Sequence, residues 1–276
     1  MIEPFQYDFF VKGVVAATLV GALCGLIGVY IVLKKMAYIG HGLSHAIFGG
    51  AVVSYIISFN FFLGASLWGF LSALLITLTT RKRKIGADSA IGIVTTASFA
   101  LGIALISRYK TFTRSFDAAL FGNILGVTNT DIVAILIVAC TAGLVIFVGY
   151  KHFLFSTFDP DIARFYGVQT GWVDTAFSII LAATIVVSMQ IMGVTLIAAA
   201  VVIPPSIARL LTDRFKAMWF ISTALGALCG FGGVYLSYYI DVSSGATVVL
   251  FSATLFVLSL LYSWLRGLRT TRRLTD

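Results

Sequence analysis

The chain has 276 residues, of which 59% are hydrophobic and only 11% are charged, with a net charge of +8 and a mean hydropathy of +1.02. Because roughly a quarter of the residues in a soluble domain are charged, this composition excludes a soluble domain and predicts a single membrane domain over residues 1–276. The positive charge does not indicate a nucleic-acid partner, since no basic patch alternates with exposed aromatic residues on a polar fold.

Apolar runs of about twenty residues recur along the chain between short charged or turn-rich segments, which is the length of a helix that crosses the ~30 Å hydrocarbon core of a bilayer. The sequence therefore predicts an all-α, polytopic bundle of eight or nine transmembrane helices. The count of eight applies if the seventh run, which contains Pro204 and Pro205, is a broken or re-entrant segment. The nine runs cover approximately residues 10–33, 37–58, 61–80, 89–107, 131–149, 171–191, 193–211, 217–239 and 244–265.

The basic residues orient this bundle. Alternation of nine spans places the N-terminus outside and the C-terminus in the cytoplasm, and 15 of the 19 lysines and arginines then fall in cytoplasmic segments. Cytoplasmic loops of membrane proteins carry the excess of Lys and Arg, so this distribution supports the assignment. We expect a multi-pass protein of the bacterial plasma membrane whose basic face meets anionic lipid.

Two of the three histidines, His41 and His45, lie four positions apart in the second apolar run. Residues so spaced project from one helix face, and two neutral imidazoles there can bind one divalent transition-metal ion. Ionisable groups inside a membrane usually mark a transport path, so we expect a metal pathway. The alternative is a packing pair hydrogen-bonded to Ser44 or to backbone carbonyls. Gly42 stands where an HExxH protease has its glutamate, which argues against a metal hydrolase.

Two ligands are too few for a stable tetrahedral metal site. A second copy of the chain across a twofold axis would supply two more, or Ser44 or water would complete the shell. An incomplete site suits transport, because the ion must also leave. At the ~1.5 Å rise of an α-helix, the pair is expected roughly 6–12 Å inside the cytoplasmic edge.

The cytoplasmic stretch "FDPDIARFYG" carries the signals of a short helix over residues 159–167. Asp159 precedes a proline, which is favoured at the first helical position, and Gly167 suits the C-terminal cap. The helix would lie parallel to the membrane and present Asp161, Ala163 and Arg164 to the cytoplasm. On these residues alone, an ordinary amphipathic connector is the favoured interpretation.

Two further stretches indicate close helix packing. "GALCGLIGVY" at 21–30 is echoed by "GALCGFGGVY" at 226–235, and small residues let membrane helices approach closely. Ten residues from a Gly- and Ala-rich vocabulary match easily by chance, so no repeat is inferred. Pro204 and Pro205 free backbone carbonyls within an apolar run, which produces either a simple kink or a break that lines a pathway.

In chain order, four stretches resemble the membrane subunit of the zinc/manganese/iron-type ABC importers. They are "MAYIGHGLSHAIFGGAV", similar to that family's M-x-x-x-G-D-x-x-S-H-A segment, "DSAIGI" at 88–93, "FDPDIARFYGV", similar to its ATPase-coupling loop, and "GVTLIAAAVVIPPSIARLL", similar to its late proline-containing span. His45 matches the family's pathway histidine. His41 stands where the family usually has Asp, which leaves the ion preference open.

This resemblance implies a type II ABC importer architecture and a translocation pore formed by a homodimer or paired permeases. It also implies two cytoplasmic ATP-binding cassette subunits, an extracytoplasmic metal-binding protein and a coupling helix over residues 159–167. The transported ion would be manganese, zinc or iron, with no permanently bound cofactor. The chain itself would be no enzyme, and it contains no phosphate-binding loop of the G-x-x-x-x-G-K-[ST] type.

Two alternatives stay open at this point. A permease for metal chelates, of the siderophore or cobalamin type, is related to the same architecture. A secondary metal transporter normally carries several carboxylates within its spans for ion coupling. Here Asp131 and Asp174 lie at predicted span ends and no acidic residue lies in the middle of a span, which argues against that class.

Overall fold

A computed structural model describes residues 3–81, 86–109, 122–194 and 196–272. Every regular element within these ranges is a helix, and each predicted span coincides with one. The span helices are α1 (Asp8–Leu33), α2 (Tyr38–Ile56), α3 (Phe61–Arg81), α4 (Ala87–Tyr109), α6 (Asn129–Val148), α9 (Thr170–Met192), α10 (Ile197–Leu211), α11 (Phe215–Ile240) and α12 (Ser244–Arg272).

The described connections contain shorter helices as well. These are the 3-10 helices η1 (Glu3–Gln6) and η2 (Ile124–Gly126), and the α-helices α7 (Tyr150–Phe158) and α8 (Pro160–Phe165). α8 is the short helix predicted over 159–167. α7 was not predicted, because its sequence, "YKHFLFSTF", follows α6 with only Gly149 between them and carries no cap of its own.

Among the described residues, seven helices are long and apolar enough to cross a membrane. The two remaining span helices are α2, which carries both histidines, and α10, which has only 15 residues. Gly193, with φ of 77°, ends α9 directly before α10. The seventh predicted run is therefore a short helix with an interrupted entry, and the bundle is polytopic as expected.

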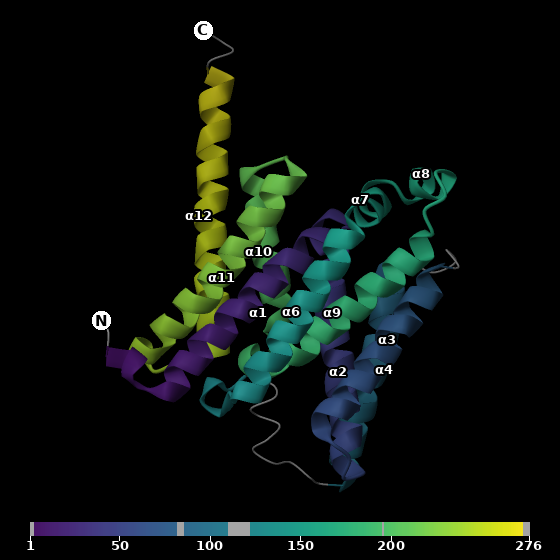
Figure 1. Ribbon diagram of the computed structural model, residues 1–276, viewed down its shortest axis with the longest axis vertical. Helices are drawn as coiled ribbons and strands as arrows, with labels where there is room; N and C mark the ends of the chain where they lie inside the picture. The colour runs from purple at the N-terminus through teal and green to yellow at the C-terminus, as the bar shows by residue number, and fades with distance from the viewer. Residues whose placement is uncertain (1–2, 82–85, 110–121, 195, 273–276) are drawn as a thin grey trace.

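The helices alternate in direction along the bundle (Figure 1). The α7–α8 segment and the C-terminal end of α12 lie toward the top of the view, whereas the N-terminal end of α1 lies toward the bottom. These two segments, both predicted to be cytoplasmic, thus lie toward the same end, as alternation of the spans requires. This end is called the α8 end below.

The interior of the bundle is built around α1, which packs against α6, α9, α10 and α11. Its contact with α11 uses the two echoed stretches directly. A Cβ atom on Gly21 would overlap the carbonyl oxygen of Gly226, one on Gly226 would overlap that of Gly21, and one on Gly230 would overlap that of Ala17. Residue numbers rise on α1 as they fall on α11, so the helices are antiparallel. The expected packing faces are confirmed, and they are faces of one interface.

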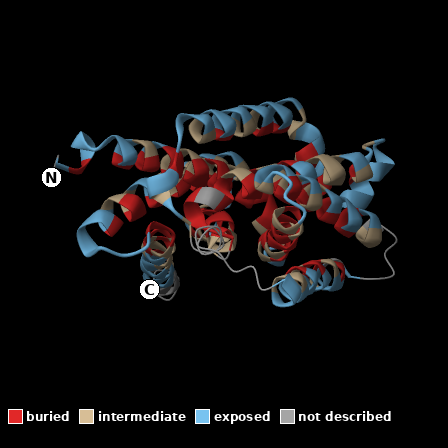
Figure 2. Ribbon diagram, turned by 90° about the horizontal axis from the view of Figure 1, so that it is seen from below, coloured by how far each residue is buried: buried red, intermediate tan, exposed pale blue. Residues whose placement is uncertain are grey.

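The outer helices present apolar side chains outward. α4, α6 and α12 are largely exposed along their apolar stretches, whereas α1 is mostly buried (Figure 2). Exposed leucine, isoleucine and phenylalanine side chains on a membrane bundle face lipid or another chain, since lipid tails solvate them well. The burial pattern accordingly matches a helix bundle surrounded by membrane.

Candidate functional site

His41 and His45 lie together on α2, as their spacing predicts. Their rings are 4.5 Å apart between centroids and inclined by 80°, and the His45 ring also meets Phe99 of α4 edge to face at 4.7 Å. Both side chains are half-buried. Nδ1 of His45 is buried and has no hydrogen-bond partner among the described residues. Buried ring nitrogens are normally paired, so this nitrogen is available to a ligand.

The neighbours of α2 show which way this pair faces. A Cβ atom on Gly42 would meet Ile91 and Thr95 of α4, and one on Gly40 would approach Ala198 of α10. Successive residues of an α-helix are turned by about 100°, so His41 lies between these two directions. The imidazoles therefore project between α4 and α10, into what we call the histidine gap.

The donor set in this gap is incomplete. No group of three or more His, Cys, Asp or Glu side chains that could hold a metal ion occurs among the described residues. Ser44 is fully buried, and its hydroxyl donates to the carbonyl of His41 at 2.8 Å. The imidazole rings take no part in that bond.

The N-terminus of α8 is capped as its sequence predicts. Asp159 is the N-cap, and its Oδ1 accepts from the backbone N–H groups of Asp161 at 3.1 Å and Ile162 at 2.9 Å. Pro160 takes the first helical position, where no N–H is needed. The short helix therefore begins at a fixed residue.

The C-terminus of α8 is equally well defined. Gly167 has φ of 83°, and its N–H donates to the carbonyl of Arg164 at 3.0 Å. The next N–H, from Val168, donates to the carbonyl of Ala163 at 2.9 Å. This pair of bonds is the Schellman arrangement, in which glycine avoids the steric cost of the left-handed conformation. The predicted cap at Gly167 is thus in place.

One prediction about α8 is wrong. Ala163 was expected to face the cytoplasm, but it is 1% exposed and packs inward. Asp161 and Arg164 are exposed, as predicted. The apolar side chains of Ile162, Phe165 and Tyr166 project outward as well, with Phe165 86% exposed. The sequence reasoning followed the charged residues and overlooked these apolar ones, although a short capped helix that ends in "RFYG" presents them on its free side.

Arg164 fastens α8 to the bundle. Its Nε donates to Thr170 Oγ1, at the first residue of α9, over 3.0 Å, and its Nη1 lies 3.3 Å from Asp161 Oδ1. The guanidinium therefore points along the protein surface between α8 and α9. Arg164 and Asp161 hold the helix, while the apolar side chains remain free for contact.

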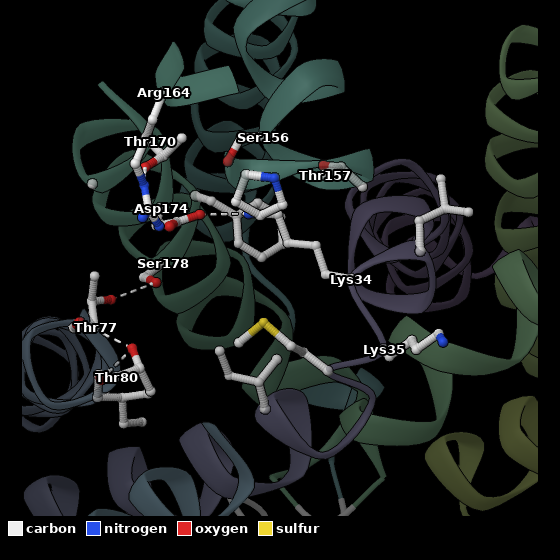
Figure 3. A pocket seen from close by; sticks show the side chains of 17 residues that line it. Lys34, Lys35, Thr77, Thr80, Ser156, Thr157, Arg164, Thr170, Asp174 and Ser178 are labelled. Carbon is white, nitrogen blue, oxygen red and sulfur yellow. Dashed lines mark hydrogen bonds and ion pairs between the residues drawn. The ribbon is translucent and has the colours of Figure 1, made fainter. Parts of the chain in front are cut away.

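A cavity of about 700 Å³ opens at the α8 end (Figure 3). Lys34, in the connection from α1 to α2, places its Nζ 2.6 Å from Asp174 Oδ1 on the second turn of α9. Thr77 of α3 and Ser178 of α9 share a 2.9 Å hydrogen bond beside it. The ion pair joins α9, which follows α8 in the chain, to the segment that leads into the histidine helix, and the Thr77–Ser178 bond joins α9 to α3.

The two carboxylates at span ends thus have structural partners. Asp174 pairs with Lys34, and Asp131 accepts from the backbone N–H of Thr128 at 2.8 Å in the capping box that begins α6.

The predicted proline pair is part of a helix contact. Pro204 and Pro205 are buried within α10. Pro205 lacks the N–H that would bond the carbonyl of Val201, and a Cβ atom on Gly28 of α1 would overlap that carbonyl oxygen and approach the Pro205 ring. α10 continues through both prolines as one helix, and the Val201 carbonyl opposite Pro205 lies against α1.

The chain combines spanning helices, a histidine pair on α2 and a capped helix with exposed apolar side chains at one end, which are features of a membrane permease. This chain belongs to the ABC 3 transport family, whose model matches residues 6–263. The resemblance drawn from the sequence is thereby confirmed.

The similarity to known proteins extends over almost the whole chain. The chain is 36% identical over 268 residues, 97% of this chain and 92% of the relative, to the manganese transport system membrane protein MntC of Halalkalibacterium halodurans. It is 31% identical to the chelated iron transport system membrane protein YfeC of Yersinia pestis, over 99% of this chain and 92% of the relative. A structure of PsaBC from Streptococcus pneumoniae in complex with Fab matches with a TM-score of 0.83 at 32% identity, covering 94% of this chain and 93% of that one.

Proposed function

We propose that the chain is the translocation subunit of an ATP-driven importer that carries manganese, iron or zinc into the cytoplasm. The observation that carries this proposal is the His41–His45 pair, whose ring centroids are 4.5 Å apart and in which Nδ1 of His45 has no partner among the described residues. Relatives named for manganese and for chelated iron transport support it. The metal is cargo, with no resident cofactor, and ATP hydrolysis belongs to partner subunits.

The proposed working unit contains two permease chains. Two imidazoles are half of a tetrahedral shell, and the gap that they face lies beside α4, which is largely exposed. A second copy, or a paired permease, placed across this gap would bring two more imidazoles and enclose a path. An extracytoplasmic metal-binding protein would deliver the ion to the mouth of that path.

The proposed contact with the cytoplasmic ATPase is α8. Asp159 and Gly167 fix its ends, Arg164 and Asp161 hold it against α9, and Ala163 anchors its inner face. Ile162 and Phe165 would insert into the ATPase surface. Movement of α8 would reach α2 through α9 and the Lys34–Asp174 ion pair, which joins α9 to the start of the histidine helix. The C-terminus lies on this same cytoplasmic side in the proposal.

Reconstitution tests this function directly. Proteoliposomes that contain the permease, its ATPase and its metal-binding protein should accumulate radioactive manganese or iron only when ATP is supplied on the ATPase side. The purified chain alone should hydrolyse no ATP, because the phosphate chemistry is supplied by the partner. Accumulation driven by an ion gradient without ATP would instead identify a secondary transporter and contradict the proposal.

Replacing Ile162 and Phe165 together with serine should uncouple the two subunits. The double variant removes the apolar surface that projects from α8, while the caps and the Arg164 contact stay intact. We expect metal uptake to fall at least about tenfold, the consequence of losing the ~1.5 kcal/mol or more that buried aromatic and aliphatic side chains contribute. Membrane insertion should be unchanged. The matched control is Phe59→Ser, which replaces an exposed phenylalanine in the α2–α3 connection. Equal uptake by the control and the double variant would contradict the proposal that α8 is the docking element.

A further inference from the structure

A second concave surface lies at the α8 end, between the last turn of α6, the first turn of α7 and the first turns of α11. This groove has a volume of about 560 Å³ and is predominantly apolar. Phe147 and Val148 of α6 and Phe220 of α11 line it and are each more than half exposed, and Trp219 forms another part of its wall. The groove is thus open to the surroundings of the bundle.

The rim of the groove is basic and unneutralised. Lys151, Lys216 and His152 line it, and none of its ten lining residues is acidic. In the described part of the chain, three other basic residues at this end have carboxylate partners, namely Lys34 with Asp174, Arg164 with Asp161 and Arg209 with Asp213. No such partner occurs for Lys151 or Lys216 among the described residues. The charge on this rim is therefore free to attract an anion.

The groove wall also contains an unused hydrogen-bond donor. Nε1 of Trp219 is buried and has no acceptor among the described residues. Buried donors are nearly always paired, and an ester or phosphate oxygen that entered the groove would provide an acceptor after a small rotation of the indole. Tryptophan is enriched at the headgroup level of membranes, where an apolar ring is combined with one hydrogen-bond donor.

We propose that this groove binds one anionic phospholipid of the cytoplasmic leaflet. The acyl chains lie along Phe147, Val148 and Phe220, and the phosphate lies between Lys151 and Lys216. Basic pockets between transmembrane helices on the cytoplasmic side hold anionic headgroups in this way. The inference rests on the proposed function only for the orientation of the bundle in the membrane, in which the α8 end is cytoplasmic.

The position of the groove favours lipid over a protein partner. α6 packs on α1 and α9, whereas the histidine gap lies between α4 and α10, so a second copy placed across that gap would not cover the groove. The apolar residues that project from α8 lie on a separate helix, where the ATPase is proposed to dock. A surface of exposed aromatic side chains with a basic rim, at the end of spanning helices, matches the chemistry of a phospholipid from headgroup to acyl chain.

Native mass spectrometry of the intact chain, extracted in mild detergent from nanodiscs of mixed phosphatidylglycerol and phosphatidylethanolamine, tests the proposal. The unmodified chain should retain one phosphatidylglycerol. Lys151→Gln combined with Lys216→Gln should weaken that binding about tenfold or more, from the loss of two lysines near the phosphate. Lys35→Gln combined with Arg209→Gln removes the same charge at the same end and should retain the lipid. Trp219→Phe should weaken retention to a smaller extent.

The outcomes of this experiment distinguish an anionic lipid from other occupants of the groove. Equal retention by the two double variants would overturn the proposal, and so would retention of phosphatidylethanolamine as strongly as phosphatidylglycerol, because the rim would then have no role. If the Lys151/Lys216 variant instead lost its dimer, the groove would be an interface between copies and the lipid assignment would be wrong. Metal uptake is not the readout, so failure here is distinguishable from failure of the proposed import function.

Discussion

Metal uptake should be abolished when His45 is replaced with alanine. His45 provides the buried Nδ1 that has no partner among the described residues, and its ring stands between His41 and Phe99. Removal of one imidazole from each of two copies leaves the proposed site with two ligands instead of four, which is too few to take the ion from water. We expect transport in reconstituted proteoliposomes to fall at least about a hundredfold, in line with the 10–100-fold or larger losses that follow damage to a metal's ligand shells.

A second variant separates ligation from packing. His45→Phe keeps an aromatic ring against Phe99 but removes both nitrogens, and it should be as inactive as His45→Ala while its thermal stability stays close to that of the unmodified chain. If His45→Phe transported normally, the nitrogen would have no role in the path. Full transport by the His41→Ala/His45→Ala double variant, with unchanged ion preference, would show that both histidines are only packing residues.

The first histidine should determine which ion passes. His41→Asp replaces imidazole with a hard, charged oxygen ligand, which suits manganese better than zinc or ferrous iron. We therefore expect this variant to retain uptake and to shift its preference toward manganese. Competition between radioactive manganese and unlabelled zinc, at a fixed amount of the same metal-binding protein, measures the shift without a change in delivery.

The architecture was accessible from the sequence because its determinants are local. Each apolar run became a helix, since a backbone within lipid has to satisfy its own hydrogen bonds. The ends of α8 were equally accessible, because the aspartate–proline start and the glycine stop act within a few residues. The α2 histidines share a face for the same reason, as i and i+4 residues of one helix.

The features that were not predicted depend on tertiary neighbours. Ala163 and Phe165 are both apolar residues of α8, and only the position of α7 and α9 decides that the first is buried and the second exposed. Likewise, the two glycine-rich stretches were recognised as packing faces, but neither sequence indicates which helix it packs against. The direction of the histidine pair, toward the gap between α4 and α10, also follows from the relative placement of three helices, α2, α4 and α10.

The α1–α11 contact yields the second large expected effect, which is loss of the folded bundle in Gly226→Leu. Gly226 faces Gly21 so closely that even a Cβ atom would overlap the facing backbone, and no rotamer relieves this overlap because the backbone fixes the position of Cβ. The cost should exceed the ~1–3 kcal/mol typical of an overpacked core, because α1 contacts four other helices and its displacement disturbs all of them. Gly226→Ala should show the same effect to a smaller degree. Membrane-inserted protein, measured by fluorescence-detected size exclusion and a thermal melt, should be sharply reduced for leucine and lowered in Tm for alanine.

The control for this substitution is Gly143→Leu on α6, where an added Cβ would meet nothing within 4 Å. It introduces the same side chain into a spanning helix, and it should be neutral or slightly stabilising, since leucine exceeds glycine in helix propensity by up to about 1 kcal/mol. A Gly226→Leu chain that melted at the same temperature as Gly143→Leu would show that the two helices can separate without loss of the fold. The small residues of the echoed stretches would then have a role other than close packing of α1 against α11.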